Sequence, residues 1–250
     1  MSYSNYHTHT TFCDGSNTPE QIVRRAIELG MDEIGFSAHS DLCNDLVGYR
    51  RAVRELQERY SDKISVRLGI EYDYFFDVDI SDYDYVIGGV HYLPVKGEVC
   101  PIDMSEDTFF KTLNDYYGSD IYSLCDHYFE IVSGVCEKTK CDIVAHFDLV
   151  TKYNDTGKFF DTKNPRYLKS AFAALDELLK KPVIFEINTG AIARGYKTEP
   201  YPALPFIEKI RECGSDIILS SDCHNMDRLT ESFDKYKHLA TLDKLDFKRK

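Results

Sequence analysis

Short apolar runs of strand length alternate with longer amphipathic segments along the whole chain. The short runs are rich in Val, Ile, Phe and Tyr and stop at polar or turn-forming residues, a pattern typical of buried β-strands. It predicts seven strands, at 3–10, 32–39, 64–74, 85–91, 142–146, 183–188 and 216–222. The amphipathic segments predict helices at 19–29, 47–60, 109–116, 119–138, 166–180, 203–213 and 227–239, with irregular chain at 94–107 and 152–164 and a basic tail at the end.

Regular alternation of strands and helices favours parallel pairing with right-handed crossovers, and therefore an α/β barrel that is closed or nearly closed. A chain of 250 residues is long enough for one large core. No linker rich in Gly, Pro or Ser and no internal repeat interrupts it, so we expect a single domain over 1–250.

Two histidines in the first predicted strand are the first sign of chemistry. His7 and His9 are two residues apart, so an extended strand points both imidazoles to one face, which suits a divalent metal. Such a pair also occurs by chance. Further ligand types at other strand ends favour a metal site; they are His39, Glu71, His91, His146, Asp222 and His224.

Charge and composition limit the kinds of molecule that the protein is expected to bind. The formal net charge of −12 argues against binding a nucleic-acid backbone, but not against a small phosphorylated substrate, because bound metal ions reverse the local sign. The sequence contains neither an apolar run of membrane-spanning length nor a signal-peptide pattern. The eight cysteines form no Cys-x-x-Cys pair. We therefore expect a cytoplasmic protein with reduced thiols and no membrane partner.

These motifs resemble those of the polymerase-and-histidinol-phosphatase (PHP) superfamily along the whole chain. The matching motifs are His7-Thr8-His9 with Asp14, Ser37-Ala38-His39, Gly69-Ile70-Glu71, His91, Ala145-His146-Phe147-Asp148 and Ser221-Asp222-Cys223-His224. The resemblance implies a distorted seven-stranded, TIM-like barrel that binds three divalent metal ions. Its implied metal ligands are His7, His9, Asp14, His39, Glu71, His91, His146, Asp222 and His224.

The number of ligands agrees with this implication. Nine side chains, with Glu71 bridging, make about ten metal bonds, or about three or four per ion, which leaves positions for water and substrate. The family layout groups the ligands as His7, His9, Glu71 and Asp222, then Glu71, His91 and His146, then Asp14, His39 and His224. Cys223 is interpreted as packing, and Zn, Fe and Mn all remain open as the metal.

A loop after the sixth predicted strand indicates which group of family members the chain resembles most. Arg194, followed by Glu199-Pro200-Tyr201-Pro202, is similar to the loop of stand-alone histidinol-phosphatases. The resemblance implies a phosphoric monoester hydrolase that cleaves histidinol phosphate in histidine biosynthesis. Arg194 and His39 would bind phosphate, Glu71 would hold the metals, and Asp222 or a water would protonate the leaving group. Asp41 is a candidate for the cationic end of the substrate, as are Asp45 and Asp77.

Three alternatives stay open from the sequence. They are another PHP phosphoesterase acting on phosphotyrosine, nucleotides or oligonucleotide ends, an amidohydrolase-type enzyme cleaving C–N bonds, and a non-catalytic metal-binding module. The oligomeric state is left open. Several other residues receive secondary predictions: Lys152 and Arg166 as weaker phosphate ligands, Asp73 and Asp148 as hydrogen-bond partners of imidazoles or solvated groups, and His127 and His238 as structural.

Overall fold

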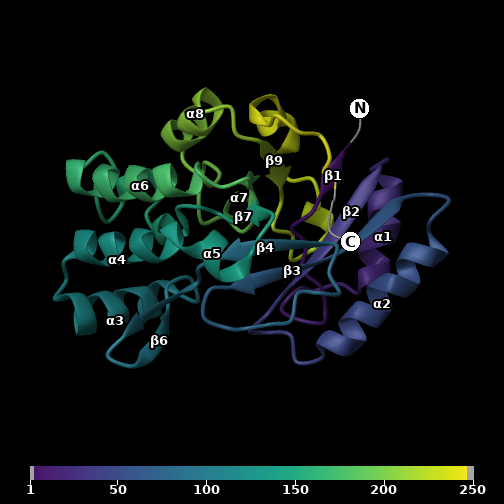
Figure 1. Ribbon diagram of the computed structural model, residues 1–250, viewed down its shortest axis with the longest axis horizontal. Helices are drawn as coiled ribbons and strands as arrows, with labels where there is room; N and C mark the ends of the chain where they lie inside the picture. Colours follow the sequence, from purple (N-terminus) through teal and green to yellow (C-terminus); the bar gives the residue numbers. More distant parts are fainter. Residues whose placement is uncertain (1–2, 247–250) are drawn as a thin grey trace.

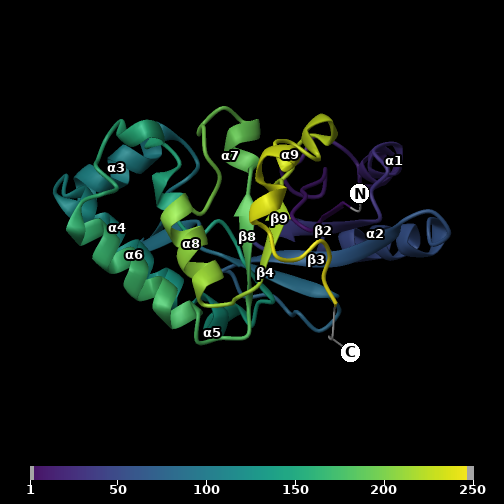
Figure 2. The same cartoon turned by 90° about the horizontal axis from the view of Figure 1, so that it is seen from above.

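The computed structural model describes residues 3–246, so residues 247–250 of the predicted basic tail lie outside the described residues. Seven parallel strands form one sheet in the order β1-β2-β3-β4-β7-β8-β9 (Figure 2). The strands are β1 Ser4–Asn5, β2 Glu33–His39, β3 Ser65–Asp73, β4 Tyr85–Gly89, β7 Ile143–Val144, β8 Ile184–Asn188 and β9 Ile217–Ser220. This confirms the predicted seven-stranded α/β barrel.

The first and last strands approach each other just beyond their regular segments. Thr8 and Cys223 form a parallel bridge, in which the amide of His9 donates to the Cys223 carbonyl at 2.8 Å. In return the Cys223 amide donates to the His7 carbonyl at 3.1 Å. These bonds nearly close the sheet into a barrel. They also bring the first motif, His7-Thr8-His9, next to the last, Ser221-Asp222-Cys223-His224.

Helices pack around this sheet, α1 and α2 on one side and α3, α4 and α6 on the other (Figure 1). The α-helices are α1 Pro19–Glu28, α2 Leu46–Arg59, α3 Glu106–Tyr117, α4 Ile121–Ser133, α5 Val135–Thr139, α6 Pro165–Leu178, α7 Gly190–Ala193, α8 Leu204–Glu212 and α9 Phe233–Tyr236. Short 3-10 helices cover Leu149–Thr151, Asp155–Gly157, Met226–Arg228 and Lys237–Leu239. None of the helices in residues 3–246 combines the length and apolar character needed to cross a bilayer.

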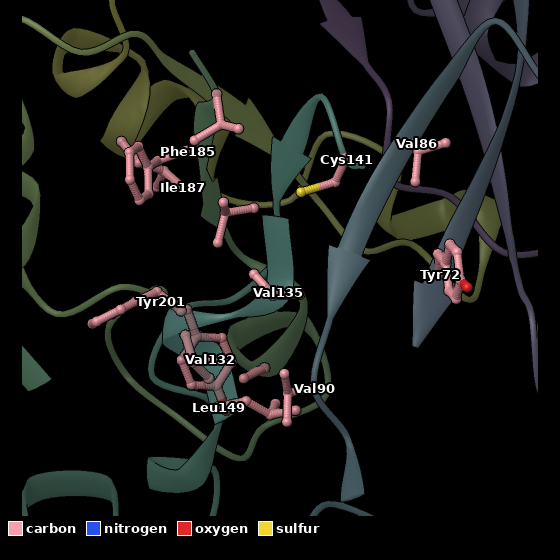
Figure 3. Packing of buried hydrophobic residues seen from close by; sticks show 14 of the residues in the cluster. Tyr72, Val86, Val90, Val132, Val135, Cys141, Leu149, Phe185, Ile187 and Tyr201 are labelled. Atoms are coloured by element: carbon pink, nitrogen blue, oxygen red, sulfur yellow. The ribbon is translucent and has the colours of Figure 1, made fainter. Parts of the chain in front are cut away.

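The pleat of the strands sorts their side chains into two cores, because successive residues point to opposite faces. Side chains such as Val86 of β4 and Phe185 and Ile187 of β8 belong to the large core shared with the helices, part of which Figure 3 shows. The intervening Tyr85 and Ile87 belong to a smaller cluster with Tyr6, Ile143 and Ile218. This second cluster fills the inside of the barrel.

Tyr85 closes the interior below the strand ends. Its hydroxyl donates to the carbonyls of Tyr6 and Phe36, the latter at 3.0 Å. A Cβ at Gly69 would lie 2.2 Å from this ring, so the close approach requires glycine there. The barrel interior is therefore filled with side chains at this level, below the carboxyl ends of its strands.

Several predicted elements were wrong, each for a local reason. The first strand is regular only over Ser4–Asn5, because the following residues turn aside to bridge Cys223. The predicted helix at 119–138 divides at Gly134, a weak helix former with φ −95° and ψ −2°. The predicted helix at 227–239 breaks at Ser232, which adopts a left-handed conformation with φ 60°.

A hairpin occupies the segment predicted to be irregular at 94–107. Strands β5 Tyr92–Val95 and β6 Glu98–Pro101 pair antiparallel. Lys96 and Gly97 connect them with φ 49° and 84°, the two positive values of a type I′ turn. A Lys-Gly pair between short apolar runs was the available sequence signal.

Candidate metal centre

Strand alternation places ligand types inside the barrel at its carboxyl-terminal rim. His39 ends β2 and pairs in register with Glu71 of β3, while the neighbouring Ala38 and Ile70 face the helices. On β4, Gly89 leaves room for the site, because a Cβ there would lie 2.9 Å from His91 and 3.3 Å from Glu71. A bulkier residue in place of Gly89 would push these side chains apart.

The carboxylate of Glu71 is the centre of the cluster. One oxygen, Oε2, lies 3.1, 3.4 and 3.0 Å from ring nitrogens of His7, His9 and His39. The other, Oε1, lies 3.3 Å from His91 Nε2 and 3.0 Å from His146 Nε2. Five imidazoles from four separate segments of the chain therefore surround one buried carboxylate.

A second group adjoins it at the opening of the barrel. Asp14 Oδ2 lies 3.0 Å from His224 Nε2 and 3.8 Å from His39 Nε2. The His9 ring stacks between those of His39 and His224, with centroids 4.3 and 4.2 Å away. Asp222 links the two groups, since its Oδ1 lies 3.2 Å from His9 Nε2 and 3.4 Å from His224 Nδ1.

All nine predicted ligands thus converge, although one local expectation was wrong. The sequence reasoning placed Asp222 and His224 on one face of a continuing extended strand. Instead β9 ends at Ser220, and Asp222 takes a left-handed conformation with φ 46°. This rare backbone state turns the Asp222 carboxylate toward His9. The Cys223 thiol is buried and donates to the Asn225 carbonyl, away from the cluster.

Three buried atoms of the cluster indicate that it is suited to bind cations. His7 Nε2, His9 Nε2 and Glu71 Oε2 are buried and make no aligned hydrogen bond with any described residue. Yet His7 Nε2 lies 3.1 Å from Glu71 Oε2, and His9 Nε2 lies 3.2 Å from Asp222 Oδ1. Close polar atoms that are not aligned with one another are arranged to share a cation. Imidazole and carboxylate donors in this number fit divalent metal ions.

Protonation differs from one imidazole of the cluster to another. Burial and the imidazoles of His224 and His39 lower the pKa of His9 to about 3, so its ring is neutral and one ring nitrogen has a free lone pair. Burial would also lower the pKa of His7 and His91, but neighbouring carboxylates hold both pKa values well above the ordinary value. Burial would raise the pKa of Glu71, but the surrounding imidazoles hold that pKa well below its ordinary value. The pKa of Asp222 is likewise well below normal, since Arg194 and His7 outweigh the effect of burial. The carboxylates are therefore ionised.

Buried polar groups behind the cluster fix its orientation. Glu186 of β8 was missed by the sequence reasoning; its Oε2 lies 2.9 Å from His7 Nδ1, and its Oε1 accepts from the His146 amide at 2.8 Å. A charged residue inside the apolar run 183–187 was the available signal. Asp73 lies 3.2 Å from His91 Nδ1 and accepts from the His91 amide, as predicted.

Glu186→Gln is expected to weaken divalent-metal affinity by about 10- to 100-fold. Both Glu186 oxygens accept hydrogen bonds, from His7, His146 and Asn188, and an amide group must misdirect a donor toward one of them. Competition against a chromophoric chelator would measure the affinity. The matched control is Glu33→Gln, a buried carboxylate on β2 that pairs with Arg67. Unchanged metal affinity in Glu186→Gln would contradict the orienting role.

The cluster opens into a cavity of about 280 Å³ whose lining contains basic and acidic groups besides the proposed ligands. Arg194 and Lys152 are the basic lining residues, and the Arg194 side chain, 30% exposed, donates to Asp222 Oδ2 at 3.0 Å. We call Asp41 and Asp103 the acidic side of the cavity; the Lys152 ammonium lies 3.3 Å from Asp103. Asp41 accepts a hydrogen bond from the Tyr92 hydroxyl with Oδ2, and its Oδ1 is buried without a partner among described residues.

Other predicted residues lie away from this cavity. Asp45 caps α2 by accepting from the Gly48 amide at 2.8 Å, and Asp77 pairs with Lys138 on the surface. Arg166 pairs with Asp120 and Asp126 rather than reaching the site. Asp148 bonds the Ala203 amide and no imidazole. His127 lies 2.7 Å from the Tyr117 hydroxyl, and His238 is exposed. Tyr92 and Asp103 reach the cavity from the β5–β6 hairpin and the segment after it, and Lys152 reaches it from the end of the 3-10 helix Leu149–Thr151.

A parallel barrel with a buried imidazole–carboxylate cluster at its carboxyl-terminal rim defines a metal-dependent hydrolase type of architecture. The PHP domain family model matches residues 5–190, and the chain belongs to this family. The chain is 27% identical to a Schizosaccharomyces pombe protein described as a probable histidinol-phosphatase, over 87% of this chain and 79% of that one. It is 26% identical to the histidinol-phosphatase of Lactococcus lactis, over 90% and 85% of the two chains.

A solved structure agrees with the fold. The Lactococcus lactis histidinol phosphate phosphatase, crystallised with zinc, L-histidinol and phosphate, superposes with a TM-score of 0.74 at 23% identity. The match covers 96% of this chain and 93% of that chain. The barrel architecture is therefore that of PHP-domain proteins over nearly the whole length.

Proposed function

We propose that the protein is a metal-dependent phosphomonoesterase that hydrolyses histidinol phosphate to histidinol and phosphate. The observation that carries the proposal is the convergence of nine imidazole and carboxylate side chains beneath a cavity that also holds Arg194. Relatives that span most of the chain are named histidinol-phosphatases, and a structural neighbour binds zinc, histidinol and phosphate. These findings support the substrate as well as the chemistry.

We propose that the cluster holds three divalent ions. The grouping suggested by the distances is His7, His9 and Asp222, then Glu71 with His91 and His146, then Asp14, His39 and His224. Glu71 would join the groups, because its two oxygens face different imidazoles. When bound, divalent ions act as Lewis acids that polarise the phosphoryl group and make water nucleophilic at neutral pH.

Protein purified without chelator is expected to contain about three divalent ions per chain. The reason is the number of available donors, since nine side chains with one bridging carboxylate supply about three or four bonds per ion. Elemental analysis by plasma mass spectrometry would measure the content. A fully active sample that saturates reproducibly at one ion per chain would reject the three-ion site.

The residues of the chain itself have separable roles in this proposal. Arg194 presents its guanidinium beside Asp222 and His224, where it can pair with two phosphate oxygens and neutralise charge as it develops. Asp222 Oδ2 accepts from Arg194 and lies 3.4 Å from the Asn188 side-chain amide, so its carboxylate is held in place. Because this carboxylate is ionised, it is a candidate for orienting a water that protonates the leaving oxygen rather than for supplying a proton of its own.

The acidic side of the cavity suits the other end of histidinol phosphate. That end carries an ammonium and an imidazole, both of which can donate hydrogen bonds. Asp41 Oδ1 is a buried acceptor without a partner among the described residues, and the Tyr92 hydroxyl fixes the same carboxylate from the other side. Asp103 contributes a second carboxylate, although Lys152 lies 3.3 Å from it. Asp41 is therefore the main proposed contact for the cationic end.

The proposal is tested by measuring phosphate release from histidinol phosphate by metal-loaded protein. A panel with phosphotyrosine, nucleoside monophosphates and p-nitrophenyl phosphate would run in parallel. Histidinol phosphate is expected to give the highest kcat/KM of the panel. Turnover of another ester with no turnover of histidinol phosphate would keep the phosphatase and reject the substrate, and turnover of none would reject both.

A further inference from the structure

A second cavity, of about 660 Å³, shares no lining residue with the cavity over the metal centre. We call it the α6–α8 cavity. Its walls are the segment 148–163, the first half of α6, and the segment 197–206 that leads into α8. Helices α6 and α8 lie side by side next to the barrel (Figure 2), and the Phe172 and Phe206 rings meet edge to face at 5.2 Å.

The lining of the α6–α8 cavity is apolar on one side. Leu168 and Phe172 of α6 and Pro205 and Phe206 of α8 form this wall. The volume is about 660 Å³, whereas a water molecule occupies about 30 Å³ of liquid, so the cavity is large enough for an organic molecule. An apolar wall of this kind favours a flat hydrocarbon or aromatic body.

Two buried polar groups in the same lining lack a partner among the described residues. Asp148 is 1% exposed; its Oδ2 accepts from the Ala203 amide at 3.1 Å, and its Oδ1 has no hydrogen bond. Tyr167 is also 1% exposed, and its hydroxyl has no hydrogen bond. Leaving such groups unpaired in the protein interior is unfavourable. A ligand with a donor for the Asp148 carboxylate would remove much of this cost.

Most other charged groups of the lining have partners among the described residues or lie at the surface. Asp161 accepts from the Lys163 amide at 2.8 Å, and the Lys163 side chain is exposed. Asp155 accepts from the Thr198 amide at 3.0 Å, and Glu199 accepts from the Tyr236 hydroxyl at 2.9 Å. Lys197 directs its ammonium to Thr151 Oγ1 at 3.0 Å. Asp148 is thus the buried acidic side chain of the described lining whose Oδ1 lacks a partner, and an acceptor of this kind favours an occupant that donates hydrogen bonds over an anion.

We propose that the α6–α8 cavity is a binding site for a small organic ammonium compound with a flat apolar body. Its ammonium would donate to Asp148 Oδ1, and its body would lie against Phe172 and Phe206. The site is separate from the metal centre but shares chain segments with it. Lys152 lies between Thr151 and Asn154 of the α6–α8 cavity, and Arg194 precedes Lys197 by three residues.

The probe for the test is phenethylamine, added to metal-loaded protein in saturating inorganic phosphate and followed by calorimetry. Asp148→Asn is expected to raise its Kd at least ~10-fold, because a charge-assisted hydrogen bond is lost. Thr162→Trp, which fills the lining from the 152–164 loop without changing the segment near His146, is expected to abolish binding. The metal content of each variant is measured as well. A lower content than in the wild type would show that the substitution has disturbed the metal centre.

Three controls test whether the amine binds in the α6–α8 cavity. Tyr128→Phe alters a buried tyrosine outside the lining and should leave the Kd unchanged. The anion 3-phenylpropionate, similar in size, should not bind. Asp41→Asn should not change the Kd, since Asp41 lines the other cavity. Absence of phenethylamine binding to the wild type at millimolar concentrations, equal binding by Thr162→Trp, or loss of binding in Asp41→Asn alone would each overturn the proposal.

Discussion

Glu71→Gln is expected to reduce turnover at least ~1,000-fold, equivalent to about 4 kcal/mol of transition-state stabilisation. The carboxylate of Glu71 lies within 3.4 Å of ring nitrogens of five histidines, and both of its oxygens are in use. An amide in its place removes the negative charge and turns an N–H group toward imidazole nitrogens. Steady-state kinetics with metal analysis of the same sample would measure the effect.

Two controls test whether the loss is specific to the metal centre. Glu33→Gln makes the same isosteric change at a buried carboxylate on β2, where Glu33 pairs with Arg67 at 2.8 Å. It should lower stability, because a buried ion pair is broken, yet keep turnover in the protein that remains folded. His127→Ala, on α4, should keep turnover within about threefold. A folded Glu71→Gln variant with wild-type turnover would reject the proposed metal centre.

Histidinol phosphate is expected to have a kcat/KM at least ~100-fold above that of p-nitrophenyl phosphate. Both esters present the same phosphate to Arg194 and the metal centre. Only histidinol phosphate has cationic groups for the acidic side of the cavity, and two well-made polar contacts contribute roughly 3 kcal/mol. Initial rates of phosphate release for the two esters would give the ratio. Equal kcat/KM values would reject histidinol phosphate as the natural substrate.

Single substitutions test which residues cause the preference for histidinol phosphate over p-nitrophenyl phosphate. Asp41→Asn should lower the ratio of the two kcat/KM values by at least ~10-fold, because Asp41 lines the cavity and its Oδ1 has no partner among the described residues. Asp45→Asn is the matched control, since Asp45 lies on the same loop but caps α2. Arg194→Ala should weaken both esters alike, because the role proposed for Arg194 is confined to the phosphate that the two esters share. A ratio that survives Asp41→Asn would move the cationic subsite to Asp103 or elsewhere.

The pattern of apolar residues in the strands predicted the architecture. Successive side chains of a strand point to opposite faces of the sheet, so a residue's position in the strand indicates which core it joins. Val86 and Ile87 differ by one position, and they lie in the outer and inner cores as this alternation requires. The same reasoning located the ligands, because parallel strands present their carboxyl ends on one rim. The helical pattern was a poorer guide at Gly134 and Ser232. At each of these residues the backbone conformation interrupts a helix that the pattern predicted to be continuous.

The sequence by itself determined the alternation of strands and helices, and hence the barrel, and it determined which candidate ligand types stand at the strand ends. Only the tertiary structure decided how they meet. Glu186 contacts His7 across 179 positions, and Asp103 reaches the cavity after a hairpin that the pattern did not show. Asp222 faces His9 through a left-handed backbone that no periodicity encodes. Periodicity describes neighbours along one element, whereas these contacts depend on how the barrel closes and its loops fold over the rim.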